Sequence, residues 1–438
     1  MSETSLSISY TSCEDYLLSL PRHTPGQRSL PRLRRFISYL GDPHKLPQRK
    51  KIIHVGGTNG KGSVCSYLAA ILKVCGKKTA TFTSPHLISM RERISIDGQM
   101  VPEAEFVRAF EMIREKMAAF QKEQERDFHL PFFDFLFVMA LVIFSRADAD
   151  YIILECGIGG RLDATNALVN KNLAILCRIG LDHMEYLGDT LGSIAAEKAA
   201  IIRAGVPALL APQVPEALDI ITKYAAMQDA PLHVITNDAI KIDEIGNKSI
   251  DFSYQYRYDK IAGLKLMTTA LYQTENAALA VHAALLLLDG DISGATLNAG
   301  LMLAKWPGRM EELAPGIMFD GAHNEDGIRA FLASAKRATC SGKKYLIFGG
   351  IREKNSVRLV GLLSKSDIFA EITACRMENP RSLTAADLSA LFAPEQIFES
   401  AGSALSYLLG KKQAGDMIFI TGSLYLYADV KINRSNPC

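Results

Sequence analysis

Apolar runs and helical patterns alternate along the first half of the chain. Strand-like runs lie at residues 52–55, 151–154 and 173–176, and helical patterns lie at residues 103–116 and 194–202. This alternation is typical of βαβ units and predicts a mainly parallel sheet that is covered on both faces. Ligands of such sheets bind beyond the carboxyl ends of the strands, so we expect the functional residues directly after these runs.

The pattern changes twice further along the chain. Residues 232–270 contain short segments in which polar and apolar positions alternate, so we expect a small antiparallel hairpin there. Pro307 and Gly308 then interrupt a helical pattern, which predicts a domain boundary near residue 303. A new α/β pattern follows, with strands expected at residues 316–319, 345–348, 368–373 and 417–421.

A glycine-rich turn joins the first apolar run to a helical pattern at residues 63–74. It reads His54-Val55-Gly56-Gly57-Thr58-Asn59-Gly60-Lys61-Gly62-Ser63. Glycines let backbone N–H groups turn inward, and the helix start and Lys61 add positive charge, so the turn is suited to hold phosphate. A strict Walker A motif has Ser or Thr directly after the lysine, whereas Gly62 precedes Ser63 here. By itself, the turn is equally compatible with a purely structural role.

The composition of the chain limits the kinds of binding partner that we expect. The 438 residues are 48% hydrophobic and 22% charged, and the formal net charge is +2, so nothing indicates nucleic acid or an anionic membrane. The eight cysteines form no C-x-x-C pair, which predicts reduced thiols in a cytoplasmic protein without zinc. The N-terminus lacks the pattern of a secretory signal. Residues 131–144 are strongly apolar but too few to span a bilayer, so we expect a buried helix.

Three residues are candidates for metal chemistry. Glu155 ends a strand before a second glycine-rich turn, where a carboxylate could hold the magnesium of ATP or merely cap the turn. His183 follows another strand and could complete an oxygen-rich metal site, although a lone histidine is more often structural. Lys198 lies among small and apolar neighbours, where burial would favour a neutral amine; an ordinary surface lysine is the alternative.

Several motifs, in this order, resemble those of the folylpolyglutamate synthase/dihydrofolate synthase family of the ATP-dependent Mur ligase superfamily. The motifs are the phosphate turn at 54–63, Thr83-Ser84-Pro85-His86-Leu87, residues 155–166, Asp182-His183, Glu197-Lys198, Trp306-Pro307-Gly308-Arg309 and Asp320-Gly321-Ala322-His323-Asn324. The resemblance covers about residues 29–429. Tyr272 departs from it, because a histidine is usual there, and so does Asn355, where an aspartate is usual.

The resemblance implies a role for each of these positions. The ATP-binding residues would be Asn59, Gly60, Lys61, Gly62, Ser63, Asn276, Arg309, Asp320 and His323. The ligands of two Mg²⁺ ions would be Ser63, Ser84, Glu155, His183 and Lys198, with Lys198 carbamylated. The pterin end of the substrate would lie near Phe132, Phe133 and Asp163. Lys61, Lys198 and His183 would be the catalytic residues.

The resemblance also implies a fold and a reaction. We expect an α/β fold in which residues 1–303 form a P-loop ATPase-type domain with a mainly parallel sheet and residues 304–438 form a smaller Rossmann-like domain. The expected activity is ATP-dependent ligation of L-glutamate to dihydropteroate, to folates or to both, through an acyl phosphate, by a monomer. The alternatives are folylpolyglutamate synthase activity alone, a P-loop kinase or GTPase, and a non-catalytic nucleotide-binding protein.

Overall fold

The computed structural model describes residues 8–22, 29–352 and 356–435, and its contacts divide the chain into two units. The first unit comprises Met1–Ile179, His183–Asn237 and Leu279–Ala304, and the second comprises Gly180–Asp182, Asp238–Ala278 and Lys305–Cys438. Residues 238–278 thus group with the C-terminal part of the chain, whereas the sequence pattern assigned them to the first domain. The division at residue 303 stays a prediction.

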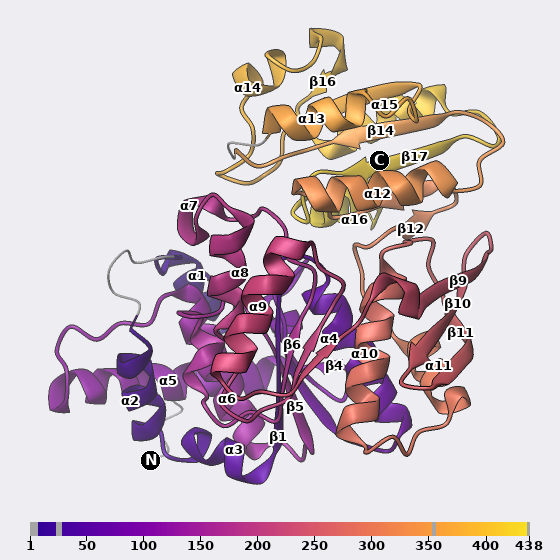
Figure 1. The fold of residues 1–438 in the computed structure, drawn as a ribbon. Coiled ribbons are helices and arrows are strands. Elements are labelled where there is room, and N and C mark those ends of the chain that lie inside the picture. The colour runs from indigo at the N-terminus through magenta and orange to yellow at the C-terminus, as the bar shows by residue number, and fades with distance from the viewer. Residues whose placement is uncertain (1–7, 23–28, 353–355, 436–438) are drawn as a thin grey trace. The chain divides into compact units, whose positions relative to one another are not determined.

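Within the described residues, an eight-stranded sheet forms the centre of the first unit (Figure 1). The strand order is β4-β3-β2-β5-β1-β6-β7-β8. The bounds are β1 Lys51–Gly56, β2 Thr79–Phe82, β3 Ile94–Ile96, β4 Gln99–Met100, β5 Tyr151–Glu155, β6 Leu173–Leu176, β7 Ala208–Leu210 and β8 Leu232–Val234. Only the pairs that involve β3 and β4 are antiparallel among these strands, so the predicted mainly parallel sheet is confirmed.

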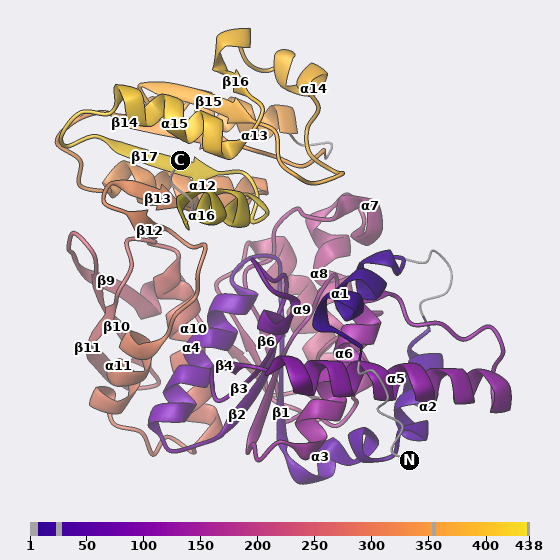
Figure 2. The ribbon, with the colours of Figure 1, turned by 180° about the vertical axis from the view of Figure 1, so that it is seen from behind.

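Helices cover both faces of this sheet. The bounds are α1 Tyr10–Ser19, α2 Leu30–Tyr39, α3 Leu46–Arg49, α4 Lys61–Val74, α5 Glu103–Glu123, α6 Phe132–Arg146, α7 Met184–Leu187, α8 Leu191–Ala199, α9 Pro215–Met227 and α11 Gly294–Leu303. Figures 1 and 2 place α4 and α11 on one side of the sheet and α5, α6, α8 and α9 on the other. The helix predicted at 194–202 is α8, which starts three residues earlier because Thr190 caps its first turn, and which ends three residues earlier at Ala199.

Helix α6 is the buried helix expected from the apolar stretch. Every residue from 134 to 144 is buried, and the helix packs in a core with α1, α2 and α5. No helix of the described residues is both long and apolar enough to cross a membrane. The apolar stretch therefore fills the space between the sheet and the helices on this face.

Helices α4 and α11 approach each other closely at one position. A Cβ atom added to Gly300 of α11 would lie 2.5 Å from the Cα atom of Ile71 in α4. Since real Cβ atoms do not approach a backbone so closely, only glycine lets the two helices pack at this distance. This contact fixes α4, the helix that begins at the phosphate turn, against its neighbour.

The second unit holds two further sheets among its described residues. The first is antiparallel, in the order β11-β10-β9, with β9 Ile240–Ile245, β10 Ile250–Tyr256 and β11 Asp259–Leu266. The antiparallel hairpin predicted at residues 232–270 is confirmed for residues 240–266, which form three strands. Residues 232–234 are instead β8, which pairs in parallel with β7 in the first sheet. Helix α10, Gln273–Leu287, follows the antiparallel sheet, and the helix residues from Leu279 onward belong to the first unit.

The other sheet is mixed and follows the order β12-β13-β17-β14-β15-β16. Its elements are β12 Glu311–Ala314, β13 Ile317–Phe319, α12 Glu325–Arg337, β14 Lys344–Phe348, α13 Ser356–Ser364, β15 Glu371–Cys375, α14 Ala385–Ser389, β16 Ile397–Phe398, α15 Ala401–Lys411, β17 Met417–Thr421 and α16 Leu426–Ser435. α12 contacts α13 and α15 contacts α16, as expected for right-handed crossovers on two faces. β15 starts three residues later than predicted, at Glu371, and the preceding Phe369 stacks on Phe331.

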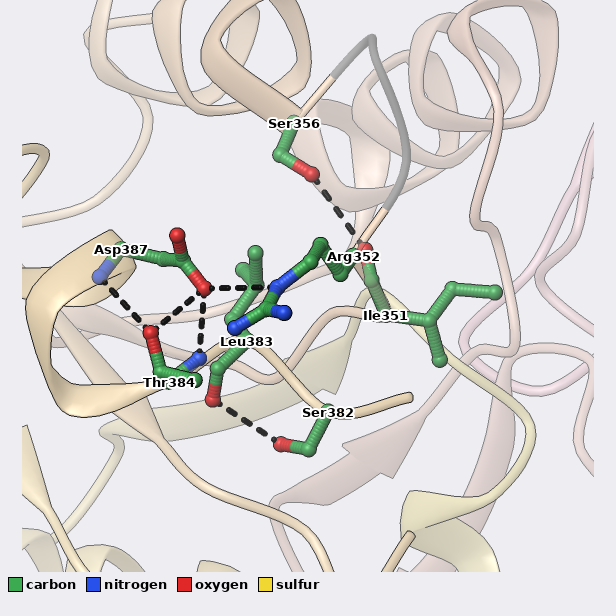
Figure 3. A network of polar contacts seen from close by, with 7 residues as sticks. All are labelled: Ile351, Arg352, Ser356, Ser382, Leu383, Thr384 and Asp387. Carbon is green, nitrogen blue, oxygen red and sulfur yellow. Dashed lines mark hydrogen bonds and ion pairs between the residues drawn. The ribbon is translucent and has the colours of Figure 1, made fainter. Parts of the chain in front are cut away.

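The turn after β14 is tied to the start of α14 (Figure 3). The Arg352 guanidinium donates to Asp387, which also accepts from the backbone N–H and the hydroxyl of Thr384 at the helix start. Leu383 donates its backbone N–H to the carbonyl of Gly350 at 3.0 Å. The position of Asn355, where the family pattern has an aspartate, lies outside the described residues.

Candidate active site

The phosphate turn follows β1, the strand between β5 and β6. The backbone of Gly57 has φ +129°, and a Cβ atom there would lie 2.7 Å from the Cβ and 3.0 Å from the Cα of Cys177. Gly60 is left-handed with φ +94° and directly precedes α4. Glycine is therefore required twice, once for the close approach to the strand end and once for the helix start.

The rest of the turn is held by backbone contacts. Thr58 and Asn59 donate their N–H groups to the carbonyl of Arg178 at 2.9 and 3.3 Å. The Lys61 ammonium donates to the carbonyl of Thr58 at 3.1 Å, so its charge lies over the turn. Ser63 is buried in the first turn of α4. The first N–H groups of α4 and the Lys61 charge together make a site for anionic oxygen atoms.

Glu155 and Ser84 lie at the ends of neighbouring strands. β2 and β5 pair with Phe82 opposite Leu154, and the backbone N–H of Ser84 donates to Oε2 of Glu155 at 2.8 Å. Glu155 is 3% exposed. Elsewhere in the described residues, as here, no three His, Cys, Asp or Glu side chains cluster at metal-binding distance. A site of one carboxylate and hydroxyl oxygens suits Mg²⁺, which keeps several of its water ligands.

Lys198 reaches the phosphate turn from α8. Its Nζ atom donates to the carbonyl of Gly57 at 2.8 Å, and the side chain is buried. Gly160 lets the second glycine-rich turn pack on the same helix, since a Cβ there would lie 2.7 Å from the carbonyl oxygen of Glu197. Arg161 donates to the Glu197 carboxylate at 2.8 Å. The alternative of a solvent-exposed Lys198 is thereby excluded.

His183 lies in the left-handed region, with φ +49°, directly before α7. This is an unusual backbone conformation for a residue other than glycine. The helix that it precedes has a single turn, and the chain continues into α8, which carries Lys198. His183 and Lys198 are thus positioned by one continuous segment of the first unit.

Asp163 is enclosed by the protein. Its Oδ1 atom accepts from the backbone N–H and the hydroxyl of Thr165, and its Oδ2 atom accepts from the N–H groups of Gly157 and Ile158 at 2.9 and 3.0 Å. A carboxylate has about four acceptor positions, so these donors fill them. Asp163 therefore organises the turn, and the predicted contact with substrate would have to replace one of these donors.

Phe132 and Phe133 begin α6 and are partly buried. A Cβ atom on Gly157 would lie 2.8 Å from the Phe133 ring, so the second glycine-rich turn packs on this ring. The Arg93 guanidinium lies 5.4 Å from the centre of the Phe132 ring. The turn thus packs on Phe133, whereas the Arg93 cation lies over Phe132.

Arg93 and His86 form a pair that the sequence reasoning missed as functional candidates. The Arg93 Nε atom donates to Nδ1 of His86 at 2.9 Å. Burial and the charge of Arg93 lower the pKa of His86 to about 3. The sequence could have indicated His86, because it lies within the Thr83 to Leu87 motif. Nothing in the sequence distinguishes Arg93 from other arginines.

In the second unit, the Asp320 carboxylate is the centre of a buried cluster. It accepts from the Tyr272 hydroxyl at 2.5 Å and from the backbone N–H groups of Met310 and Ala322 at 2.9 Å each. Burial raises the pKa of Asp320, and the Arg309 charge and these hydrogen bonds oppose the rise. Tyr272, the departure from the family pattern, thus has a defined partner in this chain.

The remaining predicted nucleotide contacts also lie in the second unit. The Arg309 guanidinium donates to the carbonyl of Gly308 at 2.9 Å and packs on Gly321, where a Cβ atom would lie 2.7 Å from it. The His323 ring lies 2.9 Å from the carbonyl of Gly321 through Nδ1. Asn276 donates to Gln273 within α10 at 2.9 Å. Their roles toward a nucleotide stay predictions.

Comparison with known proteins agrees with this arrangement. Residues 308–424 match the family model for the Mur ligase, glutamate ligase domain. The dihydrofolate synthase/folylpolyglutamate synthase of Bacillus subtilis (strain 168) is 30% identical over 415 residues, which are 92% of this chain and 94% of that protein. The folylpolyglutamate synthase of Lacticaseibacillus casei is 30% identical over 433 residues, which are 97% and 98% of the two chains.

A solved structure confirms the predicted two-domain α/β fold. It is a folylpolyglutamate synthase in complex with AMPPCP and folate, and it superposes with a TM-score of 0.86 at 27% identity, covering 98% of this chain and 100% of the other. The similarity therefore covers both units and not the glutamate ligase domain alone. The chain belongs to the folylpolyglutamate synthase and dihydrofolate synthase family of ATP-dependent ligases.

Proposed function

We propose that this chain uses ATP to join L-glutamate to dihydropteroate, to folates or to both. The observation that carries the proposal is the meeting of three elements at one edge of the first sheet: the phosphate turn, the Glu155–Ser84 pair and Lys198, whose amine donates to the carbonyl of Gly57 at 2.8 Å. The related structure with AMPPCP and folate supports the choice of substrates.

The proposed reaction has two steps. A carboxylate oxygen of the acceptor attacks the γ-phosphorus of ATP, the bond to the β-γ bridging oxygen breaks, and ADP leaves. The amine of glutamate then attacks the carbonyl carbon of the acyl phosphate, inorganic phosphate leaves, and one proton is released as the amide forms. No side-chain nucleophile is needed, so the protein acts by positioning and by offsetting charge. Lys61 and the first N–H groups of α4 offset the charge on phosphate oxygens.

Magnesium fits the oxygen donors of this site. We assign Ser63, Ser84, Glu155, His183 and Lys198 as the residues that would hold two Mg²⁺ ions. Bound magnesium offsets the negative charge of the transferred phosphate. Glu155 is oriented for this role by the N–H of Ser84, and its burial excludes water from the side of the core.

Lys198 contributes best as a carbamate. The neutral amine nitrogen would form a bond to the carbon of CO₂ and release one proton, which converts an uncharged amine into an anionic oxygen donor. A free ammonium would repel Mg²⁺, whereas carbamate oxygens attract it. The support for this proposal is the burial of Lys198 beside the phosphate turn.

The acceptors that we propose for this chain are dihydropteroate, folates or both. Of the two relatives described above, one is named for both synthase activities and the other for folylpolyglutamate synthase alone. We propose that the protein works as a monomer in the cytoplasm, where the cysteines of the described residues, all of them free thiols, would stay reduced.

The test measures ADP formed in the presence of ATP, magnesium and glutamate, with dihydropteroate or tetrahydrofolate as the acceptor. We expect ADP only when both acceptor and glutamate are supplied, and none with Lys61→Ala. ADP release that needs no glutamate would instead indicate a kinase or a simple ATPase. Activity with tetrahydrofolate alone would restrict the chain to folylpolyglutamate synthesis.

A further inference from the structure

A continuous row of polar side chains runs through the interior of the first unit beside the second glycine-rich turn. Lys171, His54, Thr165 and Asp163 are each at most 5% exposed. Lys171 Nζ lies 2.5 Å from His54 Nδ1, and His54 Nε2 lies 2.7 Å from Thr165 Oγ1. Thr165 Oγ1 lies 2.5 Å from Asp163 Oδ1. Lys171 belongs to the loop before β6, His54 to β1 and Thr165 to the segment after the second glycine-rich turn, so the row joins three separate segments of the chain.

The hydrogen bonds of this row have one consistent direction. Asp163 accepts on both oxygens, so the single hydrogen of the Thr165 hydroxyl points to it. The hydroxyl must then accept from Nε2–H of His54, which leaves Nδ1 to accept from Lys171. An amine or an ammonium of Lys171 has hydrogens for both His54 and the side-chain carbonyl of Asn166, 2.6 Å away.

The surroundings favour a neutral imidazole in this position. Burial and the charges of Lys171 and Arg203 hold the pKa of His54 well below its usual value. A neutral imidazole has one N–H group, so the direction of the row selects one of two tautomers. The Cys156 sulfur, 3.0 Å from Nε2, can share the same hydrogen and does not change this choice.

The far end of the row holds the glycine-rich turn. The Asp163 oxygen that does not face Thr165 accepts from Gly157 and Ile158, two and three residues after Glu155. Gly157 in turn packs on the ring of Phe133. The orientation of the Asp163 carboxylate thus determines the path of the turn. This turn follows Glu155, a proposed metal ligand, and packs on Phe133, a proposed folate contact.

A branch of the row reaches the helix of Lys198. Lys171 and Arg203 both donate to the side-chain carbonyl of Asn166 at 2.6 Å. The Asn166 amide donates to the carbonyl of Ala200, directly after α8, at 3.3 Å. The same buried network therefore fixes the turn and the end of α8 relative to each other.

We propose that His54 and Lys171 are positioning residues for the ligase reaction, acting through Thr165 on the Asp163 carboxylate and the turn that it holds. This inference rests on the proposed function. Neither side chain touches substrate. Their effect is to keep the turn at 157–160 in the one conformation in which Phe133 is correctly placed for the acceptor.

The kinetic test compares two substitutions of Thr165. Thr165→Val keeps the shape and removes the hydroxyl, whereas Thr165→Ser keeps the hydroxyl. We expect Thr165→Val to raise the KM for the folate acceptor by about fivefold or more, the value of one hydrogen bond, with a smaller change in kcat. Thr165→Ser and the control Thr373→Val, which removes a buried hydroxyl in the second unit, should keep the wild-type KM. Equal KM values for the valine and serine variants would overturn the proposal.

A second measurement uses the wild-type protein and does not depend on activity. Long-range ¹H–¹⁵N spectra of protein labelled with ¹⁵N-histidine report the tautomer of each ring, and contacts to the Thr165 methyl group identify His54. We expect a proton on Nε2 and none on Nδ1. A proton on Nδ1, or on both nitrogens, would overturn the proposal even if Thr165→Val does not fold. A wild-type protein that forms no amide would refute the proposed function and leave this measurement intact.

Discussion

Replacing Gly57 with alanine tests whether the close approach of the phosphate turn to the sheet is required. The added Cβ would lie 2.7 Å from the Cβ and 3.0 Å from both the Cα and the N of Cys177. Two of these atoms are backbone atoms of the segment directly after β6, so they cannot swing away as a side chain can. The turn itself would have to move, and with it the carbonyl that accepts from Lys198.

Gly57→Ala lowers the free energy of unfolding through backbone strain and through overlap with Cys177, and a smaller entropy change opposes these two contributions. A φ near +129° is open almost only to glycine, and its strain for alanine is about 2 kcal/mol. The overlap with Cys177 adds about 2 kcal/mol, and the lower entropy of the unfolded alanine chain returns about 0.5 kcal/mol. The sum is about 3.5 kcal/mol of lost stability. A turn displaced by about 1 Å should also reduce turnover by about a hundredfold.

Gly76→Ala is the matched control. Gly76 has φ +72° at the end of α4, and an added Cβ meets no atom within 4 Å, so only the strain of about 1 kcal/mol and the opposing entropy of about 0.5 kcal/mol apply. Urea unfolding followed by circular dichroism, with ADP formation on the same samples, measures both effects. A Gly57→Ala variant that is as stable and as active as Gly76→Ala would refute the reasoning.

Three further substitutions test the two units. Glu155→Gln should need about tenfold more magnesium for half-maximal activity, because one anionic ligand is lost; an unchanged requirement would make Glu155 purely structural. Lys198→Ala should lose most ADP formation, and acetate in solution should restore part of it; full activity without additive would contradict carbamylation. Tyr272→Phe should cost about 2 kcal/mol of stability near pH 7, since it removes a donor from the buried Asp320 carboxylate. Burial raises the folded pKa of Asp320 above its unfolded value, so this group stabilises the fold below the unfolded pKa and the benefit is lost as pH rises through the folded pKa. The substitution raises the folded pKa further, so its cost should shrink toward acidic pH, and a cost that does not vary with pH in urea unfolding would contradict this.

Local patterns predicted the part of the site that lies close together in sequence. The strand at 52–55, the glycine-rich turn and the helix after it are consecutive, so hydrophobic periodicity and the phosphate chemistry of Lys61 were enough. The buried helix at 131–144 was equally clear, since no polar face interrupts it. Alternation of polar and apolar positions also predicted the antiparallel strands at residues 240–266, but it did not distinguish them from the parallel strand at residues 232–234.

Contacts between distant residues could not be predicted in this way. Thr165, the neighbour of Asp163 in the buried network, contacts His54, which lies 111 residues away in sequence, and the substrate contact of Asp163 stays a prediction. Nothing in the spacing of Tyr272 and Asp320 indicates that they meet, 48 residues apart. The grouping of residues 238–278 with the C-terminal part likewise depends on tertiary contacts, such as the hydrogen bond of Leu271 to Ser334.

The close packing of Gly300 on Ile71 means that the nucleotide site is adjusted from a distance. Ile71 lies ten residues along α4 from Lys61, which is about 15 Å at the usual helical rise. A larger residue at 300 would push the helix away at that point, and a rigid helix would carry the tilt to its other end. Screens for altered ATP affinity should therefore recover substitutions in α11, a helix with no role in chemistry, and directed evolution could tune the enzyme there without changing any residue that binds phosphate.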